Sequence, residues 1–130
     1  MDFNLLYDVF ERTKAEGHQT RWNMFKPRVS QVRGELIENV NNWSQVTYES
    51  LGREINTDHR KYLGIYLHGL TYYNYERNEP PLAVLVVTEE TRRPGDGFYE
   101  QAEELGIYDP AVETEDEAFE RLSHEVFQFY

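Results

Sequence analysis

The residues of this chain best suited to chemistry are basic and aromatic side chains that could contact a phosphate backbone. Three of them, His59-Arg60-Lys61, stand at the start of a predicted helix, where the contacts of a DNA-recognition helix usually cluster. Arginine and lysine neutralise phosphate charge, and tyrosine can touch the backbone beside them. The alternative is a solvated helix face whose neighbouring aromatic rings complete the core. The residues predicted to bind duplex DNA are Tyr48, Arg53, His59, Arg60, Lys61, Arg92 and Arg93.

The acidic residues point to a different kind of partner. Residues 1–95 contain 13 acidic and 12 basic residues, whereas residues 96–130 contain 11 acidic residues and one basic residue, Arg121. The first part is nearly neutral, so the net charge of −11 does not exclude nucleic-acid binding there. The last part could mimic DNA or bind a basic protein, it could be the solvated face of a helix that closes the core, or it could reflect a salt-adapted host. The residues predicted to meet a basic partner are Glu115, Asp116, Glu120 and Glu125.

Motifs for metal binding and covalent catalysis are missing from the sequence. The absence of cysteine excludes disulfides and thiolate zinc sites, and the four histidines lack metal-ligand spacing. Asp96, Glu100 and Glu103 lie close together without the lysine of a metal-dependent nuclease, and the dipole of a helix favours acids at its start. No serine stands in a nucleophile-elbow motif. We therefore expect no cofactor and a non-enzymatic function, since an enzyme would need a convergence of side chains that the sequence does not display.

The first half of the chain reads as helices. Apolar residues recur at helical spacing over 2–16 and, after an irregular segment at 18–26, from Pro27 to about residue 41. Pro27 suits the first position of that second helix, because proline lacks the amide hydrogen that is unpaired there in any case.

A helix-turn-helix is predicted next. Thr47 is a candidate cap for a short helix over 48–55, and Thr57 or Asp58 is a candidate cap for a helix over 59–70. Two short helices joined by a tight break have the outline of this motif.

The second half alternates between loops and regular elements. We expect a loop or an irregular tail of the preceding helix over 71–81, because this segment is polar and ends in two prolines, and a buried strand over 82–87. A loop over 89–97 and a helix over 98–105 follow. Thr114 and Glu117 have the spacing of a capping box, which predicts a last helix. The apolar stripe of that helix consists of Phe119, Leu122, Val126 and Phe129.

Short motifs within residues 43–98 occur in an order known from one protein family. The run Val46-Thr47-Tyr48-Glu49-Ser50-Leu51-Gly52 is followed by Arg60-Lys61-Tyr62-Leu63-Gly64-Ile65-Tyr66-Leu67, then by Val86-Val87 and Pro94-Gly95-Asp96-Gly97-Phe98. These motifs resemble the winged-helix half of the DNA alkyltransferase and alkyltransferase-like proteins. The family's Pro-Cys-His-Arg is replaced by Pro81-Leu82-Ala83-Val84, so methyl transfer is excluded. The resemblance implies a winged helix and, with it, DNA binding.

These observations combine into one prediction of fold and function. We expect a single α+β, mostly helical domain over 1–130: two N-terminal helices in 1–42, a winged-helix-like core in 43–98 and an acidic C-terminal amphipathic helix in 99–130. The predicted function is a small non-enzymatic protein that binds DNA through the helix-turn-helix. The alternative is a protein-interaction module or inhibitor with an acidic binding surface. No apolar run spans a membrane and no signal peptide is found, so we expect a cytoplasmic protein.

Overall fold

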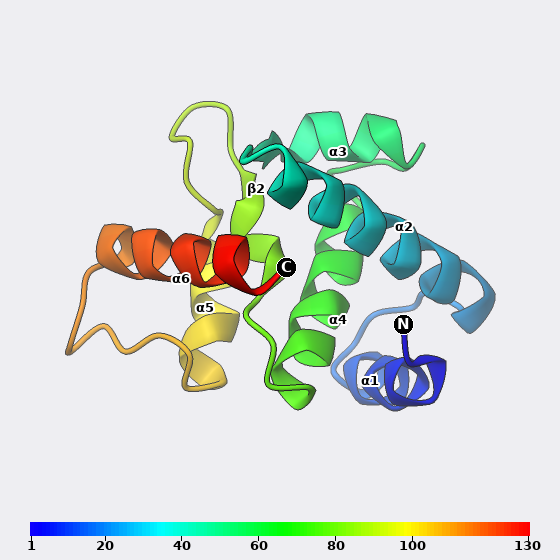
Figure 1. The fold of residues 1–130 in the computed structure, drawn as a ribbon. Coiled ribbons are helices and arrows are strands. Elements are labelled where there is room, and N and C mark those ends of the chain that lie inside the picture. Colours follow the sequence, from blue (N-terminus) through cyan, green and yellow to red (C-terminus); the bar gives the residue numbers. More distant parts are fainter.

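A helix of aromatic and aliphatic residues, α4 (Leu63–Glu76), lies at the centre of the fold (Figure 1). The computed structural model describes residues 1–130, which form a mostly helical α+β structure with one short parallel sheet. The other elements are α1 (Phe3–Ala15), α2 (Trp22–Asn41), β1 (Val46–Thr47), α3 (Tyr48–Glu54), η1 (Leu82–Leu85), β2 (Val86–Val87), α5 (Asp96–Glu104) and α6 (Glu115–Phe129). No helix combines the length and the apolar composition needed to cross a membrane.

Helix α4 is central because apolar and aromatic side chains cover most of its circumference. Helices α1, α2 and α5 and the 3₁₀ helix η1 pack against it. Gly69 lets α2 approach closely, since a Cβ atom at that position would lie 2.5 Å from Cζ of Phe25. The buried residues of α4 are Leu63, Tyr66, Leu67, Gly69, Leu70, Thr71, Tyr72, Tyr73 and Asn74.

The first predicted helix is confirmed as α1, whereas the predicted start of the second is wrong. Helix α2 begins at Trp22, within the segment expected to be irregular, and Pro27 lies inside the helix instead of at its first position. Proline inside a helix leaves the carbonyl four residues earlier, that of Asn23, without its usual donor. Both residues are exposed, so water can satisfy that carbonyl. Burial of Phe25 against Phe10 holds this first part of α2 in place.

The second helix of the predicted helix-turn-helix starts later and ends later than expected. Asp58 folds the chain into a turn, because its carboxylate accepts hydrogen bonds from the amides of Arg60 (2.9 Å) and Lys61 (3.3 Å). The helix therefore begins at Leu63 and continues to Glu76, into the segment over 71–81 that was predicted as a loop or an irregular tail of the helix. The predicted cap of α3 is confirmed, since the Thr47 hydroxyl accepts from the amide of Ser50 at 3.1 Å.

Asn74 explains why the end of α4 is ordered despite its polar composition. Its side chain is fully buried and donates to Glu79 and to the Tyr130 hydroxyl, both at 3.2 Å. Its carbonyl oxygen accepts from the amide of Leu82 at 3.1 Å. The hydroxyl of Tyr130 in turn donates to the carbonyl of Pro80 at 3.0 Å. One amide group thus joins the end of α4, the following loop and the last residue of the chain.

The predicted strand over 82–87 is only partly correct. Residues 82–85 form the 3₁₀ helix η1, and only Val86 and Val87 are in a strand. The whole run is buried, as expected, but a short apolar run does not by itself distinguish a strand from a buried helical turn. The strand pairs in parallel with β1, Val86 facing Val46. A β-hairpin wing is therefore not formed by these two strands, and the winged-helix core is not confirmed.

The C-terminal part forms two helices joined by a loop. Helix α5 begins at Asp96, two residues before the predicted start. The capping box of α6 is confirmed, with the Thr114 hydroxyl accepting from the amide of Glu117 and the Glu117 carboxylate accepting from the amide of Thr114. Phe119, Leu122 and Val126 are buried as predicted, whereas Phe129, with 54% of its surface exposed, is not.

Candidate functional site

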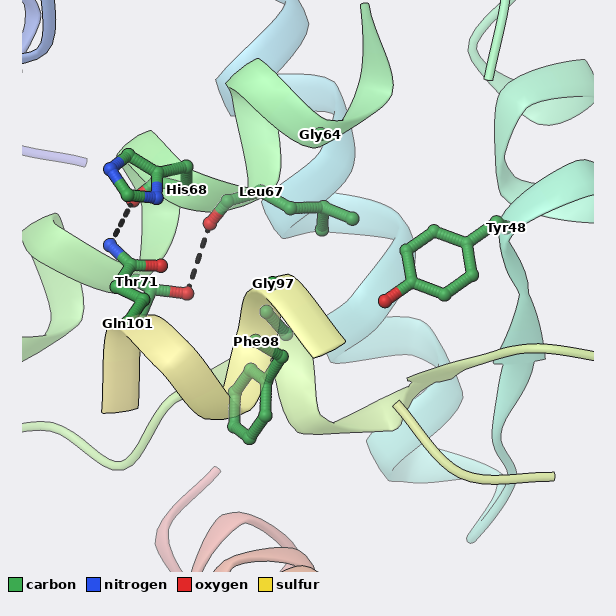
Figure 2. A pocket seen from close by; sticks show the side chains of 9 residues that line it. Tyr48, Gly64, Leu67, His68, Thr71, Gly97, Phe98 and Gln101 are labelled. Atoms are coloured by element: carbon green, nitrogen blue, oxygen red, sulfur yellow. Dashed lines mark hydrogen bonds between the residues drawn. The ribbon is translucent and has the colours of Figure 1, made fainter. Parts of the chain in front are cut away.

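A hollow of about 260 Å³ lies between α4, the start of α3 and the first turns of α5 (Figure 2). Gly64 of α4 and Gly97 of α5 line it, and a Cβ atom at either position would meet no other atom within 4 Å. The absence of two side chains therefore keeps this hollow open. Its lining residues are Tyr48, Gly64, Leu67, His68, Thr71, Ala83, Gly97, Phe98 and Gln101.

Tyr48 joins two segments at the edge of this hollow. Its hydroxyl oxygen accepts a hydrogen bond from the amide of Gly95 at 3.1 Å, just before α5. Burial raises the pKa of Tyr48, so the phenol remains protonated at neutral pH. The structure thus gives this predicted DNA-contacting residue a structural role inside the protein.

His68 also lines the hollow, and Glu16 of α1 lies beside it. Its Nε2 atom is 3.4 Å from a carboxylate oxygen of Glu16, whose other oxygen accepts from the Tyr72 hydroxyl at 3.0 Å. Gln101 donates to the backbone carbonyl of His68 at 2.9 Å (Figure 2). The hydroxyl of Thr71 donates to the carbonyl of Leu67, so it is already engaged. This group orients a histidine and a carboxylate, but it contains no activated nucleophile.

The histidine-carboxylate pair could not have been found from the sequence. Glu16 and His68 are 52 residues apart, and neither belongs to a motif. Burial lowers the pKa of the nearby His18, whose Nε2 atom lies 2.9 Å from the Thr13 hydroxyl. No group of three or more histidine, aspartate or glutamate side chains is arranged to hold a metal ion.

Two of the predicted DNA-binding arginines are already paired with carboxylates of the protein. Arg53 pairs with Glu49 of its own helix at 3.3 Å. Arg93 pairs with Asp116 of α6 at 2.9 Å, and its guanidinium lies 4.6 Å from the centre of the Phe119 ring. Arg93 therefore anchors the acidic helix, where the sequence predicted two separate binding sites.

The remaining basic candidates lie in the turn before α4 and in the loop before α5. Arg60 and Lys61 are exposed and have no carboxylate at ion-pair distance, and His59 is half-buried against Gly52. Arg92 is also exposed. Because α4 is buried on most of its circumference, it cannot insert into a DNA groove in the manner of a recognition helix.

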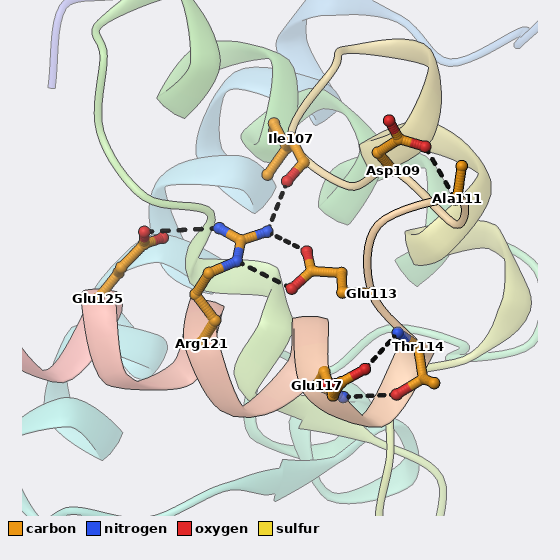
Figure 3. A network of polar contacts seen from close by, with 8 residues as sticks. All are labelled: Ile107, Asp109, Ala111, Glu113, Thr114, Glu117, Arg121 and Glu125. Atoms are coloured by element: carbon orange, nitrogen blue, oxygen red, sulfur yellow. Dashed lines mark hydrogen bonds and ion pairs between the residues drawn. The ribbon is translucent and has the colours of Figure 1, made fainter.

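Helix α6 presents the predicted partner-binding acids on a well-supported scaffold. Arg121 donates to both carboxylate oxygens of Glu113, to Glu125 at 3.5 Å and to the carbonyl of Ile107 at 2.8 Å (Figure 3). These bonds fasten the loop between α5 and α6 to the helix, and the hydrogen bond from Arg121 lowers the pKa of Glu113. The four predicted acids Glu115, Asp116, Glu120 and Glu125 are all exposed.

Helix α5 extends the acidic region. We use the term acidic surface for the exposed carboxylates of α5 and α6 together with that of Asp109, which lies in the loop between the two helices. Arg121 is the one basic residue in this part of the chain, and it is already paired. The acidic surface consists of Asp96, Glu100, Glu103, Glu104, Asp109, Glu115, Asp116, Glu117, Glu120 and Glu125.

No family model, curated protein or solved structure matches this chain. The alkyltransferase resemblance therefore stays a prediction that rests on the short motifs quoted above.

Proposed function

We propose that this protein is a non-enzymatic protein-interaction module whose acidic surface binds a basic partner. The observation that supports the proposal is the separation of roles on α6. Phe119, Leu122 and Val126 of its apolar stripe are buried in the core. Its carboxylates are exposed and, apart from Asp116 and Glu125, have no basic side chain at ion-pair distance. Carboxylates held on a fixed helix attract a positively charged surface over a distance and favour its approach in one orientation.

The experiment measures the affinity for a defined cationic probe. Deca-arginine is titrated into the full chain across a salt series, with calorimetric detection. A triple variant, Glu103→Gln, Glu115→Gln and Glu120→Gln, removes three charges from positions of the acidic surface that have no ion pair. We expect it to bind at least tenfold more weakly than the natural chain, with a smaller salt dependence, because screening acts on the charges that remain.

A matched control separates local recognition from net charge. The control variant Asp8→Asn, Glu11→Gln and Glu38→Gln removes the same number of charges from exposed positions of α1 and α2 that have no ion pair. It should bind deca-arginine almost as well as the natural chain. Equal weakening by both triple variants would mean that only net charge matters, and the proposal would be abandoned.

Binding to nucleic acid is the second candidate function. It is supported by the exposed turn that carries Arg60 and Lys61, whose side chains have no carboxylate partner. The test is duplex DNA titrated under the same conditions, with Arg60→Ala and Lys61→Ala combined. Binding that the double variant weakens equally for all DNA sequences would support a phosphate contact at this turn. If the double variant bound DNA as well as the natural chain, this turn would be ruled out as a DNA-binding site.

A further inference from the structure

A second hollow lies at the opposite end of the molecule from α6. It has a volume of about 660 Å³ and lies between the first turns of α2, the turn before α4 and the start of α4. In Figure 1 the start of α2 is at the right of the view and α6 at the left. We call this second hollow the arginine groove. Its lining residues are Gln19, Thr20, Arg21, Met24, Arg28, Asn56, Thr57, Asp58, Tyr62, Ile65 and Tyr66.

The charge of the arginine groove is unusual for this acidic protein. Two arginines, Arg21 and Arg28, and one acid, Asp58, line it. Glutamates outnumber arginines and lysines around three other hollows of the surface, and no aspartate, glutamate, lysine or arginine lines the hollow beside α5. The first turn of α2 also contains no acidic residue. The groove therefore has the most favourable lining for an anion.

Neither of these two arginines is paired with a carboxylate of the protein. Five other arginines, Arg12, Arg53, Arg77, Arg93 and Arg121, form ion pairs with carboxylates. Arg21 and Arg28 form none, although the chain has 24 acidic residues. Arg28 donates to the carbonyl of Ile55 and to Gln31, which fixes its position, while Arg21 makes no side-chain hydrogen bond.

The single acid of the groove is already engaged. The Asp58 carboxylate accepts hydrogen bonds from the backbone amides of Arg60 and Lys61, which belong to the same turn. The hydrogen bond from Arg60 is the main reason why the pKa of Asp58 is lowered. The carboxylate of Asp58 therefore stabilises its own turn, and the two arginines of the lining outnumber this one acid.

The groove also offers ring surface beside its arginines. Tyr62 is 47% exposed and lines the groove together with Met24 and the edge of the buried Tyr66. A guanidinium can bind two phosphate oxygens at once, and an exposed tyrosine ring can stack on a nucleobase. The volume lies within the range of about 300–1,000 Å³ typical of small-ligand sites. Phosphate and base recognition are thus available side by side.

We propose that the arginine groove binds a nucleotide, with Arg21 and Arg28 holding its phosphate and Tyr62 stacking on its base. The nucleotide is either free or part of a single-stranded nucleic acid. This site is separate from the acidic surface, and its existence does not depend on the partner proposed above.

The test is calorimetric titration of the full chain with AMP, adenosine, inorganic phosphate and an oligonucleotide of five thymidines. We expect saturable binding of AMP that is at least tenfold tighter than that of adenosine or of phosphate, because each alone lacks half of the contacts. Tighter binding of the oligonucleotide than of AMP would identify a strand as the natural source, and the reverse would identify a free nucleotide. Failure of both to saturate would overturn the proposal.

Variants distinguish the groove from general electrostatic attraction. Arg21→Gln should weaken AMP binding about tenfold, since a hydrogen bond to a charged group is lost. Lys26→Gln is the matched control. It removes the same charge from the first turns of α2, five residues after Arg21, but the Lys26 ammonium lies 4.5 Å from the centre of the Phe3 ring, outside the groove. Equal effects of these two variants would refute the site. Tyr62→Phe should retain binding and Tyr62→Ala should weaken it, whereas equal affinities would refute the stacking contact.

Discussion

Helices α4 and α6 are almost equal in length, 14 and 15 residues, yet they have opposite surroundings. Helix α4 has apolar and aromatic residues on most sides and is enclosed by α1, α2, α5 and η1. Helix α6 buries one stripe and exposes the carboxylates on the rest of its circumference. The comparison teaches that basic residues at the start of a predicted helix do not make it a recognition helix. A helix can bind a partner only along a face that is not buried in the core.

The largest expected effect tests whether α6 is part of the core. Replacing Phe119 with alanine should lower the free energy of unfolding by about 3–4 kcal/mol, because a buried ring is removed and a cavity remains. The half-exposed Phe129 is the control, and its replacement with alanine should cost about 0.5 kcal/mol. Urea denaturation measures both. A loss below about 0.5 kcal/mol for Phe119→Ala would make α6 a detached helix.

The second-largest predicted effect tests how closely α2 packs against α4. Gly69→Ala should lower the free energy of unfolding by about 2 kcal/mol, because the new methyl group overlaps the Phe25 ring. Gly34→Ala in α2 is the control, since its Cβ atom would meet nothing within 4 Å. There alanine should add about 0.5–1 kcal/mol through its higher helix propensity. Stabilisation by both substitutions would contradict the close packing of α2 on α4.

A smaller effect concerns the way the two helices begin. Thr114→Ala should cost about 1 kcal/mol, because it removes the side chain that caps α6. Thr114→Ser, which keeps the hydroxyl, should cost much less. Helix α4 has no side-chain cap, since the residue before it is Tyr62, and its stability depends on burial. Thermal unfolding of the two Thr114 variants measures the contribution of the cap.

The smallest predicted effect is a gain in stability, and it concerns Tyr99. Tyr99 of α5 is buried, with 5% of its surface exposed, and its hydroxyl has no hydrogen-bond partner. Burial, with a contribution from Glu115 and Asp116, raises its pKa to about 12. Tyr99→Phe should therefore add about 0.5–1 kcal/mol to the free energy of unfolding, since the unpaired hydroxyl is removed. Destabilisation in urea denaturation would reveal a partner for this hydroxyl in solution.

Elements with a strong local signal could be predicted from the sequence. The caps at Thr47 and Thr114 are confirmed, because a cap depends on residues three positions apart. The helical spacing of apolar residues also identified α1 and α6, and it identified Phe119, Leu122 and Val126 among the buried residues of α6.

Elements shaped by distant residues could not be predicted. The helical end of α4 depends on the hydrogen bonds of Asn74 to the loop and to Tyr130, which lies 56 residues further along the chain. The early start of α2 depends on rings from α1. In both cases tertiary contacts prevailed over a local preference for a loop.

The candidate sites divide in the same way. The exposed acids of α6 follow from the periodicity of one helix, so the sequence was sufficient to find them. The arginine groove brings together three segments, the start of α2, the turn at 56–58 and the start of α4, and no local pattern connects them. The ion pair between Arg93 and Asp116 likewise joins two residues that had been assigned to different partners.

The positions of the two tryptophans provide an optical reporter for each end of the molecule. Trp22 follows Arg21 of the groove and contacts the ring of Tyr7, with 5.1 Å between the ring centres. Trp43, 74% exposed, stacks on Phe127 of α6 at 5.3 Å. The chain has no other tryptophan. In a Trp43→Phe variant the tryptophan fluorescence therefore comes only from the end of the molecule that carries Arg21, and in a Trp22→Phe variant only from the contact with α6, so the surroundings of the two regions can be followed separately.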